Sequence, residues 1–189
     1  MLTTRYIAAK QSAHQLNASK SSGFGLVEVM VTVAIIGVLM GYGLPSYTNW
    51  LENSRVRNVA GSILNGLQKA RASAVTNNAL VTFTLGANNS WTIGCPTATA
   101  TCPALIDQYT ADGSSGNITA TTTPANKTTI TYSNLGTRVI SAAVAAISFN
   151  QVDVASSNVS SRALRVVVGT SGSARMCDPA FSLPDPKGC

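Results

Sequence analysis

The sequence is poor in histidine and in charged side chains. Its one histidine, His14, lies within the first 23 residues, and only 11% of the chain is Asp, Glu, Lys or Arg. The rest of the chain therefore lacks the histidine that a Ser-His-Asp triad, a Cys-His pair or a histidine-ligated metal site needs. It also lacks a glycine-rich loop followed by Lys-Ser or Lys-Thr, so no phosphate-binding loop is indicated. We expect no enzymatic activity, no bound metal and no cofactor.

Acidic residues are absent from the first 27 positions. Residues 1–23 are a basic leader with neither Asp nor Glu, which marks a cytoplasmic flank by the positive-inside rule. The cations of this leader are Arg5, Lys10 and Lys20. The stretch from Phe24 to Leu44 is almost wholly apolar and about as long as a helix that crosses a hydrocarbon core of ~30 Å. No A-x-A-like site follows Leu44, so an ordinary cleaved secretory signal is not indicated.

A single acid, Glu28, lies inside this apolar stretch. A carboxylate in lipid is costly unless it is neutralised or paired, so we interpret Glu28 as a functional residue. The junction Gly23-Phe24 comes before the apolar stretch. Cleavage there would remove the basic leader and keep the apolar helix as a permanent N-terminus.

Residues 23–31, Gly-Phe-Gly-Leu-Val-Glu-Val-Met-Val, resemble the class III signal of type IV pilins and type II secretion pseudopilins. The family pattern is Gly, Phe, Thr, Leu, a hydrophobe and Glu, and this chain departs from it only at Gly25. The resemblance implies that a prepilin peptidase cuts after Gly23 and methylates the amine of Phe24. Glu28 is then the fifth mature residue, and Pro45 falls where these proteins carry a helix-bending proline.

The physical chemistry of Glu28 fits this resemblance. A neighbouring subunit would bring a second terminal amine at Phe24 close to the carboxylate. We predict that the two groups pair, which would offset the burial of charge and fix the axial stagger between helices.

The four cysteines all lie beyond the apolar stretch, on the side opposite the basic leader. That side is the periplasm of a bacterium, which is an oxidising compartment. Four cysteines allow three pairings, of which we favour Cys95–Cys102 and Cys177–Cys189. Their spacing does not match a zinc module. Without the leader, 166 residues remain with ten Lys and Arg against seven Asp and Glu, a weak positive balance that does not by itself indicate nucleic acid.

An amphipathic helix pattern follows the apolar stretch. Apolar residues recur at three- and four-residue steps, and polar residues occupy the opposite face. The apolar stripe consists of Val56, Val59, Ala60, Ile63, Leu64, Leu67, Ala70 and Ala74. We predict one helix from Phe24 to Thr76, ended by Asn77-Asn78, whose second half needs a sheet to cover its stripe.

Strand patterns occupy the rest of the chain. Residues 81–85 alternate apolar and polar side chains, and 91–93 form the returning strand of a hairpin. Further strands are predicted at 129–132, 147–149, 163–168 and 175–177. Residues 94–127 are predicted to be a loop region with room for one short strand. For residues 139–149 the pattern does not separate strand from helix before position 147.

We therefore predict an α+β protein with a pilin fold, in which a long N-terminal helix packs on an antiparallel β-sheet domain. Its parts are a leader (1–23), a transmembrane and assembly helix (24–45), an amphipathic helix half (46–78) and a β-rich domain with a disulfide-closed tail (79–189). The chain more closely resembles the GspH/FimT family of minor pilins and pseudopilins. The motifs that carry this resemblance are Leu67-Gln-Lys-Ala-Arg-Ala-Ser-Ala74, Asn77, Trp91, Tyr132-Ser-Asn-Leu-Gly136 and Leu164-Arg-Val-Val-Val-Gly169.

This resemblance implies a minor pilin that takes part in type IV pilus assembly or in the tip complex. It would be a single-pass inner-membrane protein before assembly and a periplasmic or cell-surface pilus subunit afterwards. Its partners would be the prepilin peptidase and other pilins. Two alternatives stay open, a pseudopilin of a type II secretion system and a pilus-tip subunit that binds DNA for natural transformation.

DNA binding depends on a C-terminal Gly-Arg-x-Arg motif in resembling proteins of the FimT branch. Residues 172–175 match it only at Gly172 and Arg175, because Ser173 replaces the first arginine. Phosphate contacts need only positive charge and reach, and further candidates are Arg162, Arg165 and Lys187. No aromatic platform is interleaved with them. Our first interpretation is that these four cations are solvated surface residues. The alternative is that they form a DNA site, whose binding would be weak, independent of sequence and sensitive to salt.

Two acids lie in the second cysteine loop, Asp178 and Asp185. Carboxylates in a loop can bind calcium, but solvated loop acids are much more common. We therefore expect both side chains to face water.

Overall fold

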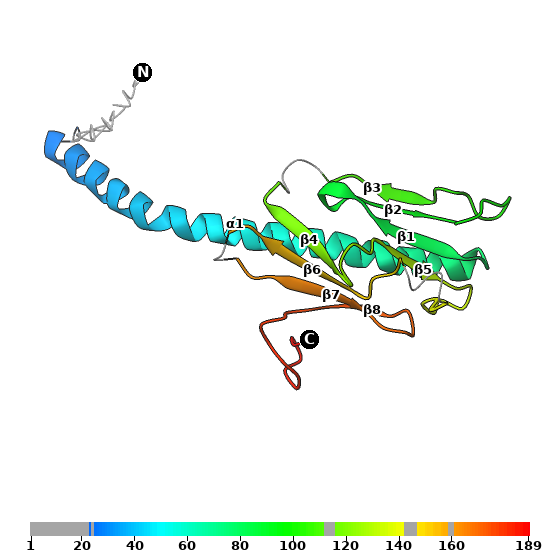
Figure 1. Cartoon of the computed structure of the whole chain (residues 1–189). Coiled ribbons are helices and arrows are strands. Elements are labelled where there is room, and N and C mark those ends of the chain that lie inside the picture. The colour runs from blue at the N-terminus through cyan, green and yellow to red at the C-terminus, as the bar shows by residue number, and fades with distance from the viewer. Residues whose placement is uncertain (1–22, 24, 112–115, 142–146, 159–160) are drawn as a thin grey trace, which may run out of the picture. The chain divides into compact units, whose positions relative to one another are not determined.

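The computed structural model describes the chain apart from residues 1–22, 24, 112–115, 142–146 and 159–160, and apart from the side chains of 42–46. The chain divides into two compact units, residues 1–42 and 43–189. Helix α1 (Leu26–Thr76) is the first element and contributes to both units (Figure 1). The bend that we predicted at Pro45 concerns the relation between the two units, and it stays a prediction.

The second half of α1 carries the predicted apolar stripe. Seven of its eight members are buried, and the eighth, Leu64, is partly buried against the same core. The helix ends at Thr76, and Asn78 follows in the left-handed region with φ of 48°. Asparagine tolerates this conformation better than most residues, so the helix stops where the sequence predicts.

The described residues after α1 form two four-stranded antiparallel sheets (Figure 1). In the first sheet the order is β3-β2-β1-β5, and in the second it is β4-β6-β7-β8. The strands of the first sheet are β1 (Val81–Leu85), β2 (Trp91–Gly94), β3 (Asp107–Tyr109) and β5 (Thr129–Tyr132). Those of the second are β4 (Ile118–Thr123), β6 (Gln151–Ser156), β7 (Leu164–Val168) and β8 (Ala174–Cys177).

A single hydrophobic core joins α1 to both sheets. Strand β1 alternates buried and half-buried residues and contributes Phe83, whose ring lies 6.3 Å from that of Phe149 and 5.8 Å from that of Trp91. Gly66 of α1 lies directly against this cluster, since a Cβ built there would be 2.7 Å from the Phe83 ring. The missing side chain therefore permits α1 to approach β1 and β2 closely.

Several strand predictions are confirmed and three are wrong. The strands at 81–85, 91–93, 129–132, 163–168 and 175–177 agree with the structure to within one residue at either end. Residues 94–127 hold two strands, β3 and β4, where we predicted one at most. Strand β6 was not predicted. Residues 147–149 form no strand, because only an isolated bridge joins Ser148 to Thr129. The ambiguous residues 142–146 lie outside the described part.

Candidate functional site

The described part of the N-terminal unit is an apolar helix whose residues are exposed. Every residue from Leu26 to Gly41 is exposed, and many of these side chains are large and aliphatic. Exposed fractions reach 75% at Leu26 and 66% at both Met30 and Leu39. A helix that is apolar around its whole circumference is stable only when lipid or other helices surround it. This surface is therefore the first candidate site.

Glu28 lies in the first turn of α1. Its backbone amide donates to the carbonyl oxygen of Gly25 at 3.0 Å, and its side chain is exposed like those of its apolar neighbours. The unpaired N–H groups of a first helical turn favour a nearby negative charge, which is one reason why an acid is tolerated there. Among the described residues no ion pair involves Glu28.

The other residues of the predicted processing signal are described only in part. Gly23 is exposed, and Phe24 lies outside the described residues. In the part of the chain whose side chains are described, no helix is both long and apolar enough to cross a membrane.

The cysteines form two local disulfides. Cys95 is bonded to Cys102 and Cys177 to Cys189, which are the two pairs that the spacing favours. Each loop is also held by backbone hydrogen bonds, for example from Cys95 N–H to the Pro103 carbonyl oxygen at 3.1 Å. Across the described residues, no three side chains of His, Cys, Asp or Glu are grouped so that they could hold a metal ion.

The predicted DNA contact Arg165 has an internal partner. It lies on β7 directly opposite Asp153 on β6. Its Nε donates to Asp153 Oδ1 at 2.5 Å and its Nη2 to Oδ2 at 3.2 Å. A bidentate pair of this kind satisfies both groups and neutralises the charge, so Arg165 contributes to the sheet rather than presenting a free cation.

Arg162 also pairs with an acid. Its guanidinium donates to the carboxylate of Asp178 and lies 5.5 Å above the ring of Phe181. Asp178 is only 6% exposed, and its Oδ1 accepts from the backbone N–H of Ala180 at 2.9 Å. Our expectation that Asp178 is a solvated loop acid is therefore wrong: the carboxylate is buried and ties the tail to Arg162, two residues before β7.

Arg175, the predicted centre of a DNA site, reaches back to the tail. Its Nη1 and Nη2 donate to the backbone carbonyl oxygens of Gly188 and Cys189 at 3.4 and 3.3 Å. Lys187 is exposed, and no ion pair involves it among the described residues. Three of the four predicted cations, Arg162, Arg165 and Arg175, therefore have internal partners in the structure.

Sequence reasoning missed a set of polar contacts that α1 makes with the end of β6 and with the segment after it. Glu52 is 8% exposed, and its Oε2 accepts from the Ser156 hydroxyl at 2.9 Å. The Asn53 side-chain oxygen accepts from the backbone N–H of Arg162 at 2.7 Å. In the sequence, Glu52 lies one helical turn before Val56, the first residue of the apolar stripe. That position alone does not predict burial, because burial depends on how α1 packs against the sheets.

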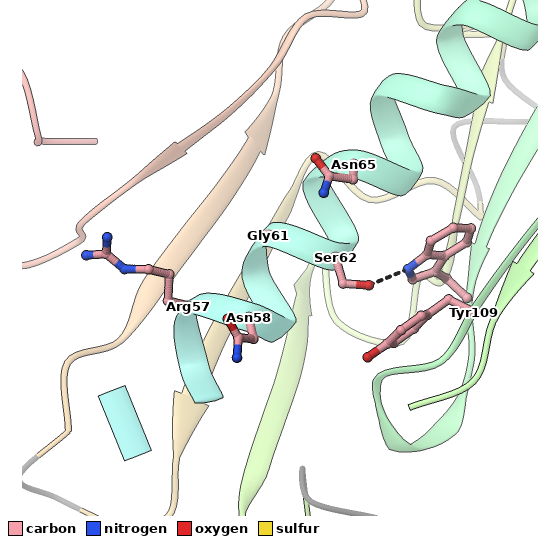
Figure 2. A pocket seen from close by; sticks show the side chains of 7 residues that line it. Arg57, Asn58, Gly61, Ser62, Asn65 and Tyr109 are labelled. Atoms are coloured by element: carbon pink, nitrogen blue, oxygen red, sulfur yellow. Dashed lines mark hydrogen bonds between the residues drawn. The ribbon is translucent and has the colours of Figure 1, made fainter. Parts of the chain in front are cut away.

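A second feature beside α1 is a pocket lined mainly by polar side chains (Figure 2). A pocket of about 470 Å³ lies between α1 and the aromatic pair Trp91 and Tyr109, whose rings stack at 5.8 Å. The indole N–H of Trp91 donates to the Ser62 hydroxyl at 2.9 Å. The residues that line the pocket include neither carboxylates nor cysteines. Near it, the ammonium of Lys69 lies 2.7 Å from Asp107 and lowers the pKa of that carboxyl group.

Two family models match this chain. The model described as "Type II transport protein GspH" matches residues 59–172, which is more than half of the chain. The model described as "Prokaryotic N-terminal methylation motif" matches residues 18–43. The second match contains Gly23, Phe24 and Glu28.

Among curated proteins, the chain is similar to type IV pilins over short segments. It is 39% identical over 51 residues to the "Type IV major alpha-pilin" of Moraxella bovis, which is 27% of this chain and 31% of that protein. It is 44% identical over 41 residues to the "Type IV major fimbrial protein FimA" of Dichelobacter nodosus, covering 22% of this chain and 26% of that protein. The matched segment thus spans less than a third of the length of these relatives.

Among solved structures, the fold is similar to that of the type IV minor pilin FimU of Pseudomonas aeruginosa in two crystal forms. The TM-scores are 0.50 and 0.51 at 14% sequence identity, and the matches cover 68% and 71% of this chain and 97% of FimU. At this identity the likeness shows the fold, an α+β pilin fold. Because the GspH model covers more than half of its residues, the chain belongs to the family of the type II transport protein GspH, whose members are pilins and pseudopilins.

Proposed function

We propose that this chain is a minor pilin that is inserted in the inner membrane, processed after Gly23, and then built into a type IV pilus or a pseudopilus. The observation that carries the proposal is the helix from Leu26 to Gly41, which is apolar on every side and has every residue exposed, with Glu28 in its first turn. In a chain of the GspH family, that surface is suited first to lipid and then to the helices of other subunits.

The energetics favour such a transfer only if the apolar surface stays covered throughout. Fully burying one Val, Leu or Ile side chain contributes roughly 1.5–3 kcal/mol relative to leaving it in water. The exposed aliphatic side chains of α1 would together make an uncovered helix insoluble. Residues 24–45 would therefore pass directly from the bilayer to the helix bundle of the filament, with Pro45 permitting a bend between the two units.

Glu28 would set the position of each subunit in that bundle. After cleavage the terminal amine lies on Phe24, and an amine from a neighbouring subunit would neutralise the carboxylate. An ion pair surrounded by apolar side chains has a strong preference for one geometry, since any other stagger leaves a charge buried without a partner. Glu28 would thus act as an assembly residue and not as a catalytic one.

The second unit would provide contacts to other minor pilins in the periplasm and at the cell surface. Residues 46–78 supply the amphipathic half of the helix, and 79–189 supply the two sheets and the tail. The two disulfides suit an oxidising compartment. We propose a structural role without catalysis. DNA uptake is not proposed, because Arg162, Arg165 and Arg175 all have internal partners.

Expression with and without a prepilin peptidase tests the processing step. Intact-mass measurement should show loss of residues 1–23 and one added methyl group at Phe24 only when the peptidase is present. A Gly23→Val variant should keep the leader and remain in the membrane. Unchanged mass in the presence of an active peptidase would contradict the proposal.

The same cells distinguish the two machines. Deletion of the gene should abolish or reduce surface pili if the chain serves a type IV pilus. If secretion of folded proteins falls while piliation is normal, the chain is a pseudopilin instead.

A further inference from the structure

The pocket of about 470 Å³ beside α1 has one helical wall and one aromatic wall (Figure 2). The aromatic wall consists of Trp91 on β2 and Tyr109 on β3. All of the described residues that line the pocket belong to the second unit. Neither the packing of the core nor the proposed processing and assembly steps require a hollow at this place. We call it the Tyr109 pocket.

The aromatic wall is held rigidly. Tyr109 is paired with Trp91 across β3 and β2, and their rings lie 5.8 Å apart and 21° from parallel. Trp91 is 7% exposed, its indole N–H donates to the Ser62 hydroxyl at 2.9 Å, and it also contacts the buried Phe83 ring. Tyr109 itself is 37% exposed. The pocket therefore presents a partly exposed ring on a fixed support, which is a preorganised surface for stacking.

The helical wall is polar along one face of α1. Four of its residues follow the spacing i, i+3, i+4 and i+7, which places them on the same side of the helix: Asn58, Gly61, Ser62 and Asn65. The two asparagines are exposed and lie about 10 Å apart along the axis. A Cβ at Gly61 would meet nothing within 4 Å, so this glycine leaves open space in the middle of the wall. Two amide groups that can each donate and accept thus flank an open centre.

This face of α1 is poorly suited to stabilising a helix. Asparagine and glycine are weaker helix formers than alanine, glutamine, lysine or arginine. The exposed positions that follow the pocket carry such strong helix formers, Gln68, Lys69 and Arg71. Unlike Gly66, Gly61 has no packing contact that requires the missing side chain. Departures from local preference of this kind are expected where a surface serves a function other than stability.

The charge of the pocket limits the class of ligand. Among the described residues that line it, Arg57 is the only charged one. A polyanion such as a nucleic acid needs several cations, and a cationic ligand needs acids. An aliphatic ligand would take the asparagine amides out of water without replacing their hydrogen bonds. The lining suits a neutral ligand that has an apolar face for an aromatic ring and polar groups at its edge, and a pyranose sugar has both.

We propose that the Tyr109 pocket binds two linked pyranose rings of a neutral glycan. The C–H face of one sugar ring stacks on Tyr109, while the amides of Asn58 and Asn65 bond hydroxyl or acetamido groups at the two ends. The distance between the two asparagines matches the length of a disaccharide. Two sources offer such sugars to a periplasmic or cell-surface subunit, which are the glycan strands of the cell wall and a polysaccharide outside the cell.

Saturation-transfer NMR of the full chain with trisaccharides tests the proposal. The chain is held in dodecylphosphocholine micelles, because this detergent contains no sugar. The probes are chitotriose, whose acetamido groups represent the cell-wall glycan, and cellotriose and maltotriose, which carry hydroxyl groups only. Indole and side-chain amide signals of the isotope-labelled chain then locate the bound sugar. The variants are Tyr109→Ala, Asn58→Ala with Asn65→Ala, and Gly61→Leu, with Gln68→Ala as a control on the same helix outside the pocket.

We expect saturation transfer to at least one trisaccharide and a shift of the indole N–H signal in the pocket. Tyr109→Ala should weaken binding about fivefold to tenfold through the loss of stacking, and the double asparagine variant about tenfold through the loss of hydrogen bonds. Gly61→Leu should abolish binding, because its side chain fills the open centre, whereas Gln68→Ala should leave the affinity unchanged. The double asparagine variant should also unfold at the same or a higher temperature, since alanine is the better helix former. A purely structural role of the two asparagines would not give that combination.

The three sugars also distinguish the sources. Tighter binding of chitotriose assigns the cell-wall glycan, and tighter binding of cellotriose or maltotriose assigns an outside polysaccharide. The inference is overturned if no trisaccharide binds, or if Gly61→Leu binds as tightly as the native chain, since the sugar then lies elsewhere. It is also overturned if an Ala-Pro-Ala-Pro peptide shifts the same signals while no sugar does, because the pocket then takes an extended peptide. In each of these cases the proposed function still stands, because processing and filament assembly do not use the pocket.

Discussion

Replacement of Gly66 by alanine tests the contact between α1 and the aromatic cluster of the first sheet. A Cβ at this position would lie 2.7 Å from a carbon of the Phe83 ring and 2.9 and 3.0 Å from two carbons of the Trp91 indole. Both rings are buried, so neither can move aside freely. Overpacking of this kind costs about 1–3 kcal/mol. Alanine in place of a helical glycine gains up to about 1 kcal/mol, so we expect a net loss of about 1 kcal/mol.

Gly61 on the same helix provides a matched control. A Cβ there would meet nothing within 4 Å, so Gly61→Ala gains the helix propensity without the steric cost. The difference between the two variants cancels the propensity and isolates the overpacking of about 1–3 kcal/mol. Urea unfolding of residues 43–189, followed by circular dichroism, measures both. If Gly66→Ala stabilises the protein as much as Gly61→Ala does, the close approach of α1 to Phe83 and Trp91 is refuted.

Three further predictions concern buried polar groups and the tail. Burial raises the pKa of the Tyr132 phenol above its usual 10.0. The unfolding free energy should therefore be unaffected by this group below pH 10 and should fall by up to about 1.4 kcal/mol per pH unit above pH 10. In urea titrations at alkaline pH, Tyr132→Phe should remove this pH dependence. Glu52→Ala leaves the Ser156 hydroxyl without its carboxylate acceptor and should lower the unfolding free energy by about 1.5–3 kcal/mol, with a loss under 0.5 kcal/mol speaking against the buried contact. Because Arg175 is bound to the Gly188 carbonyl, Arg175→Ala should accelerate hydrogen exchange in the tail, and gel-shift assays at physiological salt should show no DNA retardation by the native unit.

The helix could be predicted from the sequence because its signals are local. An uninterrupted apolar stretch and then a three-to-four-residue stripe specify α1, and Asn78 accounts for its end. The strands with alternating apolar side chains, such as β1 and β7, were equally readable. Each of these signals needs only neighbouring residues.

Two of the three missed strands, β3 and β4, lack that local signal, whereas β6 carries it, because the buried Val152 and Val154 alternate with Gln151 and Asp153. In β4 only Ile118 is buried and threonines occupy most of the rest, while β3 is an edge strand with no fully buried residue. Their pairing with β6 and β2 makes them strands, and pairing is a long-range property. The same holds for the site: the Arg165–Asp153 pair depends on the register of β6 against β7, and the burial of Asp178 depends on where the tail folds back. The sequence shows the charges but not their partners.

The central claim is that Glu28 and the apolar helix build this chain into a filament. The most direct measurement is the amount of the chain in sheared, purified filaments from cells that carry either the native gene or Glu28→Ala, with Asp185→Asn as a control acid outside the apolar stretch. We predict that the native chain and Asp185→Asn occur in the filament fraction with a methylated Phe24 at the N-terminus, while Glu28→Ala is processed but stays in the membrane. Equal amounts of Glu28→Ala and native chain in the filaments would contradict the account.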